Sequence, residues 1–202
     1  MNTKIVMGLV IGVLVLPVTL WAQRGEGGEV RAFRQQQKEE TKEHYQQQQQ
    51  ENKEFRQSLK GESPEEKKSA IEEQRQTQFQ ENKAFRQTRH DENMAFLKER
   101  LANNKRLTDA QKEELINYFE SQYQENVSFR DTQHAENVAF FQQIANDSNL
   151  TQEQKKDAIK AHFQQQKQEN IQHRKEQRTE NKAERQKIRS EVKSQAGTQS
   201  GQ

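Results

Sequence analysis

Phenylalanine recurs along this chain behind a Glu-Asn pair, in the pattern Glu-Asn-x-x-Phe. Complete copies begin at residues 51, 81, 92, 125 and 136, and degraded copies begin at residues 29, 169 and 180. Copies within a pair lie eleven residues apart, and the Glu residues at 81, 125 and 169 are spaced by 44. Eleven residues make three turns of a nearly straight α-helix, at about 3.67 residues per turn. The pattern therefore predicts long helices in which one face carries the repeat.

Within each copy, the Phe and the Asn three positions before it share that face. We call the aromatic positions the ring column, and we expect it to pack between helices. Its members are Phe33, Phe55, Phe85, Phe96, Phe129 and Phe140, with Leu107 and Tyr118 in the same register. An amide in such a seam costs stability unless it is matched, so a matched amide fixes the register. We therefore expect four asparagines to form hydrogen bonds across helices: Asn82, Asn93, Asn126 and Asn137.

Capping motifs divide the chain into four predicted helices. Ser63 as N-cap, Pro64 at the first helical position and Glu66 form a capping box, which Thr108 with Gln111 and Thr151 with Gln154 repeat. The predicted helices cover residues 29–60, 64–103, 108–146 and 151–193. Short loops favour antiparallel hairpins. The predicted fold is all-α: one elongated domain over residues 23–193, as an extended coiled coil or open bundle, with a disordered tail at 194–202.

The N-terminal segment has the order of a secretory signal peptide. Lys4 precedes the apolar run Ile5–Leu16, and Pro17 and Ala22 follow it. We expect residues 1–22 to be removed on export, which gives a periplasmic or secreted protein. An uncleaved membrane anchor is the alternative, but the run is short for a bilayer span and Pro17 interrupts it.

Composition restricts the fold and the partners. Only 29% of the residues are hydrophobic, so order must come from a narrow seam between long helices and not from a wide core. Acidic and basic residues are interleaved and the net charge is +2, which argues against the concentrated basic face that nucleic acid requires. Residues 173–193 lean basic, but four glutamates within them favour a solvated helix face. Cysteine is absent, so the chain has neither a disulfide nor a thiolate ligand.

Two of the capping sites also resemble a known motif. The segments LTDAQKEEL (residues 107–115) and LTQEQKKDAI (residues 150–159) contain Leu-Thr-x-x-Gln, formed by Leu107, Thr108 and Gln111 and by Leu150, Thr151 and Gln154. This arrangement resembles the Spy/CpxP group of periplasmic proteins. The resemblance implies a small exported all-α protein, usually a dimer, which acts as an ATP-independent chaperone or reports envelope stress. A metal-responsive branch of the group binds divalent ions. The capping chemistry alone would also account for the motif.

Candidate chemistry is sparse. There is no Gly-rich phosphate loop and no His-Glu-x-x-His pattern, so we expect neither an enzyme nor a cofactor. His90 and His134 occupy equivalent repeat positions near acidic residues and are the candidates for a metal, but a surface or seam role explains them better. His44, His162 and His173 lie in or beside the ring column, where a histidine can replace a phenylalanine ring.

Three functions remain open on the sequence. The first is an exported chaperone-like or envelope-stress protein that binds unfolded or envelope proteins along the ring column, bordered by Lys53, Arg86 and Arg130. The second is a structural coiled-coil scaffold that self-assembles, and the third is a periplasmic metal sensor. We expect a homodimer, no nucleic acid, and membrane contact through the signal peptide only.

Overall fold

The computed structural model describes residues 27–199, and this part of the chain is helical with no strand. The four helices are α1 (Gly27–Ser58), α2 (Pro64–Ala102), α3 (Asp109–Asn146) and α4 (Gln152–Gln199). The prediction of an all-α fold with four long helices is confirmed. The expected signal peptide lies outside the described residues. Within the described residues, no helix has the length and hydropathy needed to cross a membrane.

Seven of the eight helix ends lie within two residues of their predicted positions, because the caps are local features. The exception is the end of α4, which continues to Gln199, whereas we predicted a disordered tail from residue 194. No proline follows Lys193, and Ser194 Oγ bonds the Ser190 carbonyl, so nothing stops the helix at that point.

The three capping boxes form as the sequence indicates. In the first, Ser63 N donates to Glu66 Oε2 at 2.9 Å and Glu66 N donates to Ser63 Oγ at 3.3 Å. Thr108 with Gln111 and Thr151 with Gln154 make the same reciprocal pairs. Gly61, just before the first box, has φ +94°, a conformation that glycine adopts without a Cβ clash. These boxes fix where α2, α3 and α4 begin.

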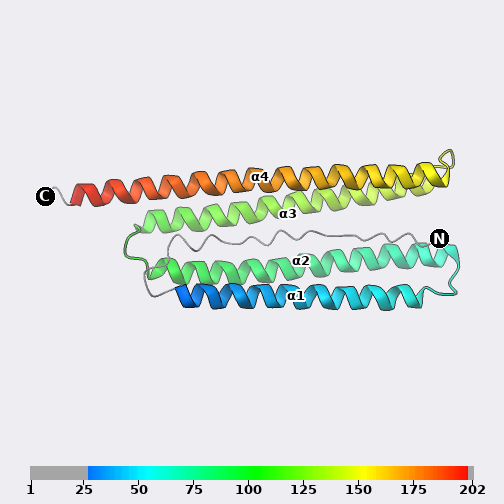
Figure 1. The fold of residues 1–202 in the computed structure, drawn as a ribbon, viewed down its shortest axis with the longest axis horizontal. Coiled ribbons are helices and arrows are strands. Elements are labelled where there is room, and N and C mark those ends of the chain that lie inside the picture. The colour runs from blue at the N-terminus through cyan, green and yellow to red at the C-terminus, as the bar shows by residue number, and fades with distance from the viewer. Residues whose placement is uncertain (1–26, 200–202) are drawn as a thin grey trace. The chain divides into compact units, whose positions relative to one another are not determined.

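The described residues divide into two compact units, which are treated separately below. The first unit contains α1 and α2, and the second contains α3 and α4; each is an antiparallel hairpin (Figure 1). Ten apolar side chains among the described residues are buried: Val30, Met94, Leu97, Leu101, Leu107, Leu115, Phe119, Tyr123, Ile144 and Ile188. Eight polar side chains are buried beside them: Gln37, Asn82, Arg86, Asn104, Gln111, Gln122, Asn126 and Gln166. With so mixed an interior, the polar contacts across each hairpin restrict the registers that its two helices can adopt.

Candidate functional site

The ring column forms stacked pairs across each hairpin. In the first hairpin, Phe33 lies parallel to Phe96 with ring centroids 4.1 Å apart, and His44 lies parallel to Phe85 at 4.0 Å. In the second, Phe129 stacks on His173 at 4.1 Å and Phe140 stacks on His162 at 4.0 Å. Successive pairs are eleven residues apart on both helices of a hairpin. The repeat therefore positions ring on ring once every three turns, about 16.5 Å along the helix.

Each histidine in these pairs also bonds the asparagine of the repeat it faces. The Nε2–Oδ1 distances are 3.1 Å for His44 and Asn82, 3.2 Å for His173 and Asn126, and 2.8 Å for His162 and Asn137. An amide oxygen can only accept, so Nε2 carries the proton in all three imidazoles.

The amide nitrogens show why the asparagine oxygens face the imidazoles. Asn82 Nδ2 donates to the Gln78 carbonyl at 2.8 Å, and Asn126 Nδ2 donates to the Gln122 carbonyl at 2.7 Å. Each of these amides is held by its own helix on one side and by the partner helix on the other. Asn82 is 6% exposed and Asn126 is 7% exposed, so a shift in register by less than one repeat would leave a buried amide unmatched.

Asn93 differs from the other three asparagines. The ring opposite its repeat is Phe33, which stacks on Phe96 and has no hydrogen-bonding group. Three of the four expected cross-helix bonds are therefore present, each with a histidine as the donor. The sequence carried a signal for these donors, since His162 and His173 stand at multiples of eleven from Phe140, and His44 stands eleven residues from both Phe33 and Phe55.

The glutamate of the repeat has a role that the sequence did not reveal. In the second hairpin, three glutamates of α4 face three glutamines of α3, and both sets are spaced by eleven. The Gln Nε2 to Glu Oε2 distances are 3.2 Å for Gln111 and Glu191, 2.8 Å for Gln122 and Glu180, and 3.5 Å for Gln133 and Glu169. The pairing follows the same antiparallel register as the rings. We call these contacts the carboxylate column.

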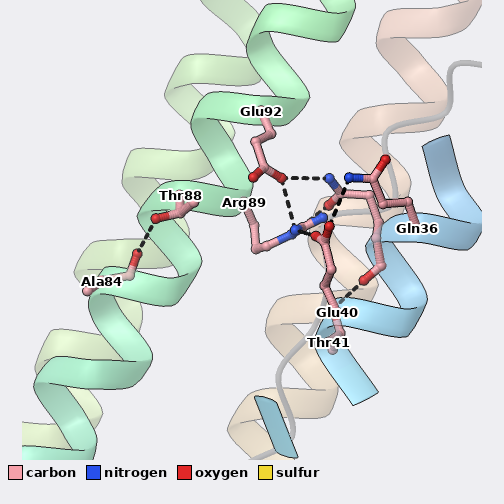
Figure 2. A network of polar contacts seen from close by, with 8 residues as sticks. Gln36, Glu40, Thr41, Ala84, Thr88, Arg89 and Glu92 are labelled. Atoms are coloured by element: carbon pink, nitrogen blue, oxygen red, sulfur yellow. Dashed lines mark hydrogen bonds and ion pairs between the residues drawn. The ribbon is translucent and has the colours of Figure 1, made fainter. Parts of the chain in front are cut away.

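The first hairpin builds the same column with arginine. Arg100 Nη1 lies 2.9 Å from Glu29 Oε2, and Arg89 pairs with Glu40. Figure 2 shows Arg89 reaching from α2 to Glu40 of α1, while Glu92 of its own helix also contacts the guanidinium. Its Nε donates to Gln37 Oε1 at 2.8 Å, and Gln37 Nε2 donates to Glu92 Oε2 at 2.9 Å. Burial lowers the pKa of Arg89, and Glu92 opposes this.

The ring column ends differently near the start of α3. Tyr118 occupies a ring position, and Glu184 of α4 takes the place of the facing ring. Burial, then Glu180 and Glu184, raise the pKa of Tyr118 to about 12. Burial also raises the pKa of the Glu184 carboxyl. Both groups are therefore held toward their neutral forms, which suits a weakly hydrated seam.

The remaining predicted residues do not gather into a site. His90 is on α2 and His134 is on α3, in different units, and no cluster of three or more possible metal ligands occurs in the described part of the chain. Burial lowers the pKa of His134. Arg86, expected to border an open client surface, is only 8% exposed. Lys53 is exposed, and Phe55 and Arg130 are half-buried.

Comparison of the chain with protein-family models, with curated proteins and with solved structures gives no match. The role of the ring column and the carboxylate column therefore has to be inferred from their own side chains. Imidazole, amide, carboxylate and phenyl groups that pair across the two helices of a hairpin favour particular registers of those helices.

Proposed function

We propose that this protein is an exported structural scaffold, in which long helices locked in register connect or space other components. The observation that carries the proposal is the repeated stacking of the ring column onto itself. Five phenylalanines, Phe33, Phe85, Phe96, Phe129 and Phe140, each have a ring of the partner helix within 4.1 Å. Rings used in this way stiffen a hairpin and are not free to hold another chain.

The exposed apolar surface supports the same reading. Among the described residues, only Val138 at 38% and Ile171 at 45% are large apolar side chains with high exposure. A holdase needs apolar surface for unfolded chains. The resemblance to the Spy/CpxP group would imply a chaperone, but the paired rings leave little such surface. Export rests on the N-terminal segment of residues 1–22.

Self-assembly is the second part of the proposal. From Phe85 to Glu184, the eleven-residue frame continues without a break through both intervening loops. Different segments therefore carry the same set of side chains once per repeat: a ring, an amide and a carboxylate. We call each such set, together with the side chains that it meets on the facing helix, a layer. A helix of a second copy presents the same layers as a helix of the same chain, so pairing between chains needs no new contact chemistry.

Two measurements on the mature protein test the proposal. Sedimentation velocity over a wide concentration range is expected to show growth into large species. Added to a chemically unfolded client protein, the scaffold is expected to leave its aggregation unchanged. Suppression of aggregation at near-stoichiometric amounts without ATP would overturn the structural role. A species of one size at every concentration would overturn self-assembly.

A further inference from the structure

Helix α4 carries a line of exposed basic side chains that the seam does not use. It consists of Lys156, Lys160, Lys167, Lys175, Arg178, Lys182, Arg189 and Lys193, all of them exposed. We call it the basic stripe. Four members, at 156, 167, 178 and 189, are spaced by eleven, and those at 182 and 193 follow the one at 160 at multiples of eleven. At the repeat's twist, the eight positions fall within roughly 65° of the helix circumference. At 1.5 Å per residue, the stripe is about 55 Å long.

The glutamates of the same segment lie on another side of α4. Glu169, Glu180 and Glu191 belong to the carboxylate column and meet glutamines of α3. Glu176 accepts from Gln172, and Glu184 faces Tyr118. From the sequence, the four glutamates of residues 173–193 favoured a solvated helix face. The fold places the three column glutamates on another side of the helix, because Glu169, Glu180 and Glu191 share one position of the eleven-residue repeat and that position is not one of those used by the basic stripe.

The stripe is also without internal partners. No side chain of the eight forms a hydrogen bond or an ion pair within the described residues. Acidic residues near it are confined to its beginning, at Glu153 and Asp157. Close to its middle, Ile171 is 45% exposed and stands eleven residues from both Lys160 and Lys182. One apolar side chain thus projects from the centre of a straight row of cations.

We propose that the basic stripe docks α4 lengthwise onto the surface of a bilayer that contains anionic lipids. A planar surface offers headgroup charge along the whole stripe, and Lys and Arg near such a surface strengthen binding by about five-fold each. Ile171 lies where an apolar side chain would enter the headgroup boundary. A nucleic-acid duplex fits less well, because its phosphates wind around its axis while the stripe runs straight.

Two charge-matched variants of the full chain test this inference. The stripe variant carries K160Q, K167Q, R178Q and K182Q. The control variant carries K38Q, K42Q, K53Q and R56Q on α1, at exposed positions that likewise form no ion pair within the described residues. Both lose three lysines and one arginine, and glutamine keeps the helix propensity. Circular dichroism verifies that both fold. Any contribution of residues 1–22 to membrane binding is equal in the two.

Binding is measured by co-sedimentation with vesicles of phosphatidylcholine, alone or mixed with phosphatidylglycerol, at low and high ionic strength. The wild type and the control variant are expected to bind the mixed vesicles alike and to weaken in salt, while the stripe variant binds at least ten-fold more weakly. Equal binding of both variants, or no preference for the anionic vesicles, overturns the proposal. Tighter, stripe-dependent binding to duplex DNA would assign the stripe to nucleic acid instead. A change in oligomeric state of the stripe variant without vesicles would assign it to a second copy. The vesicle-binding results are independent of the aggregation and sedimentation tests of the scaffold.

Discussion

Asn93 and Asn137 occupy the same position of the repeat but face different rings, and this makes them a natural pair of test sites. Asn137 accepts a bond from His162 at 2.8 Å, whereas Asn93 faces the Phe33 layer. Replacing either with leucine adds similar apolar area to the seam. Asn137→Leu also removes the acceptor from His162, a loss of about 0.5–1.5 kcal/mol for a net hydrogen bond. We expect Asn93→Leu to stabilise the protein and Asn137→Leu to be less favourable by roughly that amount.

The measurement is the free energy of unfolding in urea, followed by helical circular dichroism near neutral pH. His162→Phe completes a double-mutant cycle within one hairpin, because it gives the 140/162 layer the composition of the Phe33–Phe96 layer. In that background Asn137→Leu should behave as Asn93→Leu does, with a coupling energy of about 1 kcal/mol. Additive effects in the cycle, or Asn93→Leu destabilising more than Asn137→Leu, would refute the role assigned to the imidazole–amide bond.

Three further predictions use the same unfolding and titration assays. Thr151→Ala should lower the unfolding free energy by about 1 kcal/mol through loss of the α4 cap, whereas Thr132→Ala, at an exposed mid-helix site, should not; equal losses would contradict the capping argument. Burial and then Arg130 lower the pKa of His173 below its ordinary 6.5 in the folded state. The stabilisation from the neutral imidazole is complete above pH 6.5 and is lost as the pH falls from 6.5 through the lowered pKa of the folded state. His173→Phe should therefore flatten the decline of the melting temperature between neutral pH and about pH 5. An unchanged decline would count against this. The pKa of Tyr118 is raised from its ordinary value of 10 to about 12, so stability from the neutral phenol is lost as the pH rises from 10 toward 12. Tyr118→Phe should remove the last step of the tyrosinate absorbance titration. The same last step in the variant would contradict the assignment.

The helices and their caps could be predicted because their causes are local. A serine or threonine with a Glu or Gln three residues later specifies a helix start whatever the rest of the chain does. The long polar stretches favour helix by propensity, and only two prolines occur in the whole chain. No proline follows Lys193, where we predicted the end of α4, and this is where the predicted and observed ends differ most.

The pairing across the hairpins could not be read in full, because it depends on a register that the loops determine. The frame shifts between Phe55 and Phe85, which are 30 residues apart and not a multiple of eleven. The partner of Phe85 therefore does not follow from spacing alone. Histidine was recognised as a replacement for a ring, but its second function as a donor needs the facing asparagine, whose position follows only from the fold.

The carboxylate column and the basic stripe were missed for a shared reason. The net charge of a segment does not show that its acidic and basic side chains face in different directions. The seven acidic and twelve basic residues of α4 appear mixed in sequence, although three of the glutamates and seven members of the basic stripe recur at multiples of eleven residues. Sorting the charges by position in the repeat would have separated Glu169, Glu180 and Glu191 from the row that begins at Lys156.

Because the layers repeat every eleven residues, α3 and α4 could pair in more than one register, and the loop between them selects one. Sliding α4 along α3 by one repeat, about 16.5 Å, would bring His162 opposite Phe129, so the layers alone do not exclude it. Within a chain, the five residues 147–151 that join Asn146 to Gln152 favour the observed register, since a chain of that length spans at most about 17 Å when fully extended. Between chains no such tether acts, and pairing can be staggered.

Lengthening the loop should therefore weaken the selection of a single register. We expect a flexible Gly-Ser insertion after Ser148 to broaden the distribution of sedimenting species relative to wild type. The same segment added after Gln202 adds equal mass without altering the loop and should leave the distribution unchanged. If the loop variant instead sediments as the wild type does at every concentration, the layers themselves specify the register, and the interchange between chains on which self-assembly depends would be excluded.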